Sequence, residues 1–191
     1  MIEVGEHLTV ADVIAVARER AHVALSPRAR ARVRASRALV DRLVQEGRTV
    51  YGITTGVGEL AGVSISADQA AQLQVNIVRS HSAGVGEPLS GEIVRAMMLL
   101  RAHALALGYS GVREELVTLL LDMLNSRVHP LIPSQGSVGA SGDLAPLAHL
   151  ALAMIGEGQV VRDGEVRPSA EALSEAGLRP AVLGAKEGVA L

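Results

Sequence analysis

The strongest constraint on the fold is the spacing of aliphatic residues, which recur every three to four positions through most of the chain. That spacing places apolar side chains along one face of an α-helix. Residues that favour helix ends bound these runs, with Ser26-Pro27 at a start and Gly47, Gly108 and Gly177 after a stop. The pattern therefore predicts a mainly α-helical fold.

The apolar spacing and the residues that favour helix ends and turns predict where each helix and strand lies. Helices are predicted over residues 10–21, 27–46, 67–80, 91–107, 112–126, 144–155 and 169–176, with the start of another at 186–191. Thr9 is expected to cap the first helix, with Asp12 completing a capping box. The run 159–167 carries Asp163-Gly164 between alternating residues, which predicts a β-hairpin with a type I′ turn. The segment 48–51 is predicted to be extended.

Composition limits the core and the possible partners. The 191 residues include no Cys, Phe or Trp and two Tyr, so the core must be aliphatic, and disulfides and thiolate zinc sites are excluded. A net charge of −2 gives no overall basic surface for nucleic acid. No apolar run is long enough to span a bilayer, and the first residues lack a signal-peptide pattern. We therefore expect a cytoplasmic protein without nucleic-acid or membrane partners.

One helix is unusually rich in arginine. Within residues 27–46 few acidic side chains accompany the cluster of Arg28, Arg30, Arg32, Arg34 and Arg37. Such a cluster is either a solvated face or a contact surface for an anionic partner or another subunit.

The stretch with the most chemical information is residues 136–146, Gly-Ser-Val-Gly-Ala-Ser-Gly-Asp-Leu-Ala-Pro. Ala140, Ser141 and Gly142 lie between a Gly-rich turn and an apolar helix, and their small side chains leave the backbone unobstructed. Asp143 is suited to cap the helix that follows. Taken by itself, the stretch also fits an ordinary Gly/Ser turn. Ser141 as a hydrolase nucleophile is disfavoured, because the strand–G-x-S-x-G–helix setting is missing.

The run from Gly136 to His149 resembles the signature of the aromatic amino acid ammonia-lyases, most closely that of the histidine enzymes. The resemblance implies that Ala140-Ser141-Gly142 cyclises into 4-methylidene-imidazole-5-one, an electrophile made from the chain itself. The residues suit this chemistry, because the Gly142 amide nitrogen can reach the Ala140 carbonyl and Ser141 can lose its hydroxyl as water. No metal is implied, and the six His show no zinc-ligand spacing such as H-E-x-x-H.

A second segment matches the same family. Residues 51–58, Tyr-Gly-Ile-Thr-Thr-Gly-Val-Gly, resemble the ammonia-lyase loop that starts Tyr-Gly and carries Thr-Gly-x-Gly. The family role implied for Tyr51 is the base that removes the substrate β-proton, and Gly58 belongs to the substrate-binding part of the loop. Thr54 and Val57 stand where Asn and Phe are usual, so an aromatic wall is missing. Without the resemblance, Tyr51 would be interpreted as a half-buried strand residue.

His81 follows a predicted helix and falls on the substrate-selectivity position of the family. Ser80-His81 resembles the histidine enzymes, whereas the phenylalanine enzymes carry apolar residues there. An imidazole can donate or accept a hydrogen bond to a polar substrate group. Tyrosine ammonia-lyases also have His at this position, and a His at a helix end can equally serve only the helix dipole.

The resemblance implies the helical N-terminal domain of the ammonia-lyase fold, in the fumarase/aspartase-like superfamily, with a small β-hairpin and short extended segments. Family chains are more than twice as long, so residues 1–191 are expected to form the ring-forming domain before the central helical bundle. The full-length enzyme would convert L-histidine to ammonia and trans-urocanate. In the family's homotetramer, Tyr51 and Ser141 can come from different chains. The alternatives are a tyrosine ammonia-lyase or aminomutase, and a non-catalytic helical assembly fragment.

Overall fold

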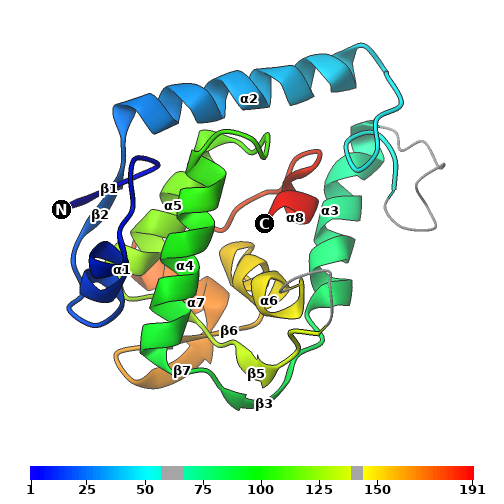
Figure 1. The fold of residues 1–191 in the computed structure, drawn as a ribbon. Helices are drawn as coiled ribbons and strands as arrows, with labels where there is room; N and C mark the ends of the chain where they lie inside the picture. The colour runs from blue at the N-terminus through cyan, green and yellow to red at the C-terminus, as the bar shows by residue number, and fades with distance from the viewer. Residues whose placement is uncertain (57–66, 139–143) are drawn as a thin grey trace.

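The structure, a computed structural model, describes residues 1–56, 67–138 and 144–191. The predictions for Gly58 and for Ala140-Ser141-Gly142 with its neighbour Asp143 fall outside those ranges. Helices make up most of the described part, which confirms the prediction of a mainly α fold (Figure 1).

The elements follow one another as helices separated by short strands. The helices are α1 (Val10–Ala17), α2 (Pro27–Gln45), α3 (Ala67–His81), α4 (Gly91–Ala106), α5 (Glu114–Asn125), α6 (Leu144–Met154), α7 (Ser169–Glu175) and α8 (Glu187–Ala190). The strands are β1 (Ile2–Val4), β2 (Val23–Leu25), β3 (Val85–Pro88), β4 (His129–Pro130), β5 (Pro133–Gln135), β6 (Gln159–Arg162) and β7 (Glu165–Pro168).

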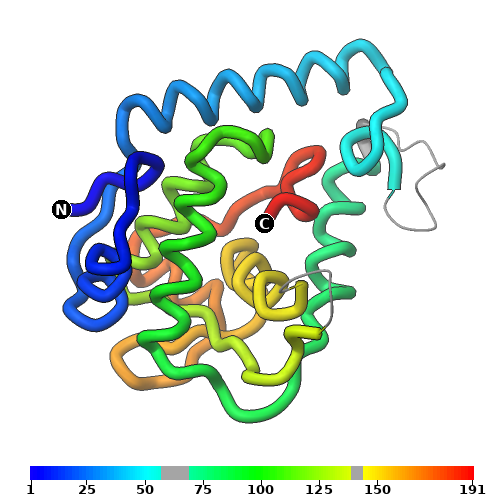
Figure 2. Tube along the Cα trace, in the orientation of Figure 1, coloured from blue at the N-terminus to red at the C-terminus, as the bar shows by residue number. Residues whose placement is uncertain are grey.

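The core lies along α4, α5 and α6, and it is aliphatic as the composition requires. Fully buried side chains on these helices include Met98, Leu99, Leu105, Leu120, Met123, Leu150 and Met154. Burying each such side chain stabilises the fold by about 1.5–3 kcal/mol. In Figure 1, α2 runs along one edge of the molecule, and α1 and α3 stand on opposite sides of α4. The tube in Figure 2 shows the N-terminus at the periphery and the last residues near the middle.

The helix ends follow the local signals in the sequence. The Asp12 backbone N–H donates to Thr9 Oγ1 at 3.2 Å and the Thr9 N–H donates to the Asp12 carboxylate at 2.9 Å, which confirms the capping box. Ser26 caps α2. The prediction that the first helix reaches residue 21 is wrong, because Arg20 has φ +59° and its left-handed backbone turns the chain toward β2.

The strands form three small sheets. The predicted hairpin is confirmed as β6–β7, and Asp163 and Gly164 at its turn both have positive φ, as a type I′ turn requires. It is joined by β4, while β1 pairs with β2 in parallel and β3 with β5 antiparallel. The segment 48–51 forms no strand, and a turn begins at Tyr51.

Candidate functional site

The structure describes two of the predicted site residues, Tyr51 and His81, and both flanks of the predicted ring-forming tripeptide. The flanks are β5 with residues 136–138 on one side and α6 on the other. The site can therefore be built from the segments that hold these positions.

The pairing of β3 with β5 joins two parts of the predicted site. Val85, four residues after His81, lies opposite Gln135, five residues before Ala140, and Pro88 lies opposite Pro133. Paired strands lie about 4.8 Å apart. The chain that leaves His81 and the chain that approaches the tripeptide are therefore neighbours.

His149 on α6 reinforces this contact. The Gly84 backbone N–H donates to His149 Nε2 at 3.1 Å. A Cβ atom on Gly84 would lie 3.1 Å from that nitrogen and 3.3 Å from the Cβ of Pro133, so a larger residue would force the segments apart. A Cβ on Gly136 would similarly lie 3.0 Å from the Cβ of Ala145. Two glycines and one imidazole thus set the spacing of three segments.

The hydrogen bond defines the state of the His149 ring. Because Nε2 accepts a hydrogen bond from a backbone N–H, a neutral imidazole carries its own proton on Nδ1. Burial lowers the pKa of His149, which favours this neutral form. The sequence analysis gave His149 no role. The one feature of the sequence that could have drawn attention to it is that it is the only ionisable side chain in the apolar run of α6.

His81 presents one ring nitrogen for binding. Its Nδ1 lies 2.9 Å from the Ile77 carbonyl oxygen and 3.1 Å from Ser80 Oγ. A carbonyl only accepts, so Nδ1 is the donor and Nε2 of the neutral ring is left as an acceptor. No hydrogen bond joins Nε2 to another of the described residues. The half-buried ring can therefore bind a polar group that donates a proton.

Tyr51 has very different surroundings. Its side chain is 63% exposed, at the start of a turn after α2, so the interpretation as a half-buried strand residue is wrong. Thr54 Oγ1 accepts from the Val50 N–H at 2.9 Å and donates to the Arg48 carbonyl. The buried Thr55 hydroxyl accepts from the Gly52 N–H at 3.3 Å. Two threonines therefore shape the turn.

The structure does not bring Tyr51 and His81 together. His81 ends α3, and the turn that begins at Tyr51 lies at the other end of that helix in Figure 1. With 15 residues, α3 is about 22 Å long at 1.5 Å per residue. Within one copy of the chain, the two candidate side chains are therefore separated.

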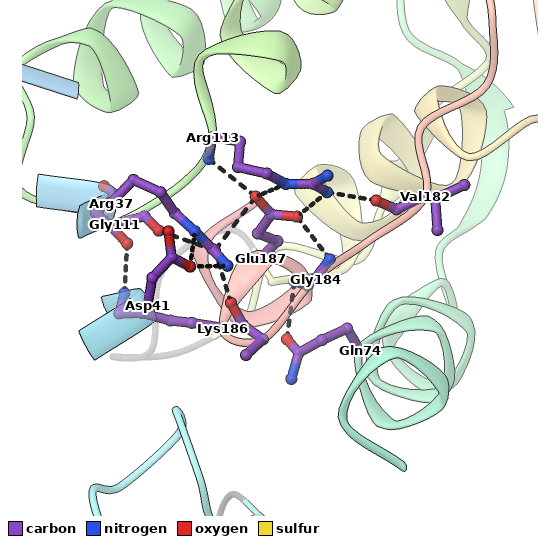
Figure 3. A network of polar contacts seen from close by, with 12 residues as sticks. Arg37, Asp41, Gln74, Gly111, Arg113, Val182, Gly184, Lys186 and Glu187 are labelled. Carbon is purple, nitrogen blue, oxygen red and sulfur yellow. Dashed lines mark hydrogen bonds and ion pairs between the residues drawn. The ribbon is translucent and has the colours of Figure 1, made fainter. Parts of the chain in front are cut away.

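A buried ionic network fixes α3 against the C-terminal segment (Figure 3). Glu187 is fully buried and accepts from the backbone N–H and Nε of Arg113, each at 2.9 Å, and from the Gly184 N–H at 2.6 Å. Burial acts to raise the pKa of Glu187, but these hydrogen bonds hold it below its ordinary value. On α3, the buried Gln74 side chain accepts from the Gly188 N–H at 2.8 Å.

The arginine cluster of α2 is largely neutralised within the chain. Arg30 and Arg34 both pair with Glu114 at the start of α5. Arg37 pairs with Asp41 at 2.8 Å and reaches Glu187 at 3.5 Å. The cluster therefore acts mainly as an internal contact between α2, α5 and the C-terminal segment.

Two features are absent from the described ranges. None of the helices they contain is both long and apolar enough to cross a membrane. Within the same ranges, no three His, Asp or Glu residues lie close enough together to hold a metal ion.

Comparison with known proteins connects these features. A family model described as "Aromatic amino acid lyase" matches residues 8–191. The chain is 54% identical over 190 residues to histidine ammonia-lyase of Symbiobacterium thermophilum, and it spans 38% of that protein. The crystal structure of histidine ammonia-lyase from Trypanosoma cruzi matches all of this chain with a TM-score of 0.92 and 44% identity, over 36% of its own length. Tyrosine aminomutase from Streptomyces globisporus matches 99% of this chain with a TM-score of 0.90 and 40% identity, also over 36% of its length.

Proposed function

Because this chain belongs to the aromatic amino acid lyase family, we propose that residues 1–191 are the N-terminal, ring-forming part of a histidine ammonia-lyase. The full-length enzyme eliminates ammonia from L-histidine and releases trans-urocanate. The observation that carries the proposal is the β3–β5 pairing with the Gly84–His149 hydrogen bond. These contacts support a single site made of His81 and the segment between β5 and α6.

The residues around the tripeptide fit ring formation. Strained backbone persists only where its surroundings enforce it. Here β5 and the close packing of Gly136 on Ala145 fix one flank, and α6 fixes the other. Ala140 and Gly142 add no bulk that would oppose closure. Once formed from Ala140, Ser141 and Gly142, the ring supplies an electrophilic methylidene carbon.

Each remaining residue has a distinct part in the proposal. We expect Asp143 to cap α6, whose positive N-terminal end favours negative charge developing beside it. His81 binds the imidazole of the substrate through Nε2, and Gly58 lets the loop approach the substrate closely. Tyr51 takes the β-proton. Since Tyr51 and His81 lie at opposite ends of α3, we propose that a second copy of the chain supplies Tyr51, within a homotetramer.

The test of this function is a substrate comparison with the full-length protein. L-histidine is expected to give urocanate, followed by its ultraviolet absorbance, while L-phenylalanine is not turned over. Chelators are expected to leave the rate unchanged, because the proposed cytoplasmic enzyme needs no metal. Residues 1–191 alone are expected to be inactive, since the chain spans only 38% of its histidine ammonia-lyase relative.

The second candidate is a tyrosine ammonia-lyase or aminomutase, which the similarity to the Streptomyces globisporus aminomutase favours. Turnover of L-tyrosine without turnover of L-histidine would establish this candidate and contradict the first. Formation of a β-amino acid would identify the mutase reaction, whereas release of ammonia with an unsaturated acid would identify the lyase.

A further inference from the structure

A cavity of about 710 Å³ lies away from the candidate site, where the end of α1, the start of α4 and the β6–β7 turn meet. In Figure 1 these elements lie on the side of the molecule opposite α3. Its lining residues are Ala17, Arg18, Arg20, Gly91, Glu92, Arg95, Arg127, His129, Val161, Asp163 and Gly164. None of them is a residue of the proposed catalytic site.

The cavity contains a buried cation that has no carboxylate partner among the described residues. Arg95 is 4% exposed, and its Nε and Nη2 donate to the Val16 carbonyl at 2.9 and 2.7 Å. Its Nη1 lies 3.3 Å from the Leu124 carbonyl and 2.9 Å from His129 Nε2. These four contacts use four of the five guanidinium N–H groups and provide no countercharge. A buried charge of this kind is normally paired.

Neighbouring groups add positive charge. Burial, then the positive charges of Arg20 and Arg127, lower the pKa of Arg95. Burial and the charge of Arg95 lower the pKa of His129 to about 4, so His129 is neutral at pH 7. Of the two carboxylates in the lining, Glu92 is paired with Arg18 at 2.9 Å. Four arginines against two carboxylates leave an excess of positive charge.

Arg20 and Arg127 occupy unusual backbone positions. Both have φ of +59°, just after α1 and α5, where glycine is the usual residue. Arg20 forms no ion pair with any residue in the described ranges, and Arg127 approaches Asp163 only to 3.9 Å. Two exposed arginines thus stand at the rim of one cavity, in positions where the backbone favours glycine, above the buried Arg95.

The lining also limits the shape of a ligand. Among the described residues that line the cavity there is no Phe, Tyr or Trp, and the apolar side chains are Ala17 and Val161. An apolar molecule would therefore find few contacts. The first turn of α4, which contributes Gly91 and Glu92, adds the positive end of a 16-residue helix. Guanidinium groups bind phosphate and carboxylate oxygens in the same forked geometry.

We propose that this cavity is a binding site for a small oxyanion with two or more negative charges, held by Arg20, Arg95 and Arg127. The ligand carries phosphate or carboxylate groups and neutralises the positive charge that the described part of the chain leaves unpaired. This site is independent of the ammonia-lyase reaction, because its residues do not contribute to that mechanism.

The test is isothermal titration calorimetry of the full-length protein with tripolyphosphate and with citrate, and with acetate as the singly charged control. The key variants are Arg20→Gly and Arg127→Gly, which remove charge but keep a residue suited to positive φ. Each is expected to weaken binding about tenfold, because one charge-assisted hydrogen-bonding group is lost. Asp163→Gly, also at positive φ, is expected to tighten binding. Arg179→Ala, an exposed arginine outside the cavity, should leave the affinity unchanged.

Thermal unfolding without ligand separates binding from a structural role. Arg20→Gly and Arg127→Gly should melt at the same temperature as the parent or higher, since glycine fits their backbone conformation. Binding of tripolyphosphate alone would identify phosphate chemistry, and binding of citrate alone carboxylate chemistry. The proposal is overturned if neither anion binds saturably, or if both arginine variants bind as tightly as Arg179→Ala. Histidine turnover is measured separately, so failure here leaves the proposed reaction untouched.

Discussion

The two ends of α3 differ in how the chain holds its candidate catalytic groups. At the C-terminal end, the segment after His81 packs on β5 and α6 so closely that a Cβ at Gly84 would lie 3.1 Å from His149 Nε2. At the other end, Tyr51 stands 63% exposed on a turn shaped by threonine hydroxyls. The end near His81 is held by contacts within the chain, whereas the Tyr51 side chain at the other end points toward solvent. This difference is what we expect of a site completed by another copy.

The largest expected effect is on activity, and it comes from variants that each remove one proposed catalytic residue. In the full-length protein, Tyr51→Phe is expected to lower kcat by about 10²–10⁴-fold, the usual contribution of a proton-transfer group. Ser141→Ala, which removes the hydroxyl that must leave to form the ring, is expected to lower kcat at least as much. Co-expressed variants should regain a substantial fraction of the activity, because mixed oligomers contain sites with both intact residues. Activity that stays at the single-variant level after co-expression would contradict a site shared between copies. Each variant expressed alone is the control.

The next effect concerns the anchoring of α3. Glu187→Ala should lower the free energy of unfolding by about 2–3 kcal/mol, because it removes a buried carboxylate and leaves the Gly184 N–H without its acceptor. The loss of the ion pair with Arg113 adds less, since the Arg113 side chain is 38% exposed. Denaturant unfolding of the purified protein measures the change. Glu165→Ala, which removes an exposed partner of Arg167, is the matched control and should change stability by less than about 1 kcal/mol.

The lowered pKa of Glu187 also predicts how the stability of the fold depends on pH. The folded-state pKa of Glu187 lies below its ordinary value of 4.5, so its contribution is complete above that pH. Stability should fall as the pH drops below 4.5 and through the folded-state pKa. The slope of stability against pH in this range should be smaller in Glu187→Gln than in the parent. Equal slopes in the two proteins would show that another group controls the acid response.

A smaller effect is expected at the packed end. Gly84→Ala should cost about 1–3 kcal/mol, because the new Cβ would lie 3.1 Å from His149 Nε2 and 3.3 Å from the Cβ of Pro133. Gly91→Ala is the control, since no described residue outside its chain neighbours and its own helix backbone lies within 4 Å of the added Cβ, and its φ is not positive. Chemical denaturation of both variants gives the comparison. A Gly84→Ala protein as stable as Gly91→Ala would disprove the tight spacing.

The smallest effect is expected at the exposed end. Thr54→Val removes the hydroxyl that bridges the Val50 N–H and the Arg48 carbonyl. The loss should be about 1 kcal/mol or less, because Arg48 is exposed and Val50 only half-buried, so both backbone groups can bond to water instead. Thr54→Ser, which keeps the hydroxyl, should restore the parent's stability. Larger losses than those of Gly84→Ala would reverse the contrast between the two ends.

Local chemistry made parts of the fold predictable. The Thr9–Asp12 capping box and the Asp163-Gly164 turn depend on residues close in sequence, and both were predicted. The β3–β5 pair was not, because Val85 and Gln135 are 50 positions apart and neither strand has a clear alternating pattern. Pairings of this kind depend on tertiary packing more than on propensity.

The candidate site was predictable only in part for the same reason. Motifs identified Tyr51 and His81 as residues, but their separation by the length of α3 is a property of the folded chain. His149 and Gly84, which are in contact, are 65 positions apart in the sequence. The only sign of this contact in the sequence is a polar residue within an apolar helix. The charged cavity around Arg95 is lined by four segments that are far apart in the sequence, so no sequence motif predicts it.

The proposed reaction requires Ser141 to be dehydrated within a ring closed between Ala140 and Gly142. Intact-mass spectrometry of the full-length protein tests this directly. We predict a mass lower than the encoded sequence by two water molecules, and a Ser141→Ala variant at its full encoded mass. Full encoded mass in the parent protein would contradict the account.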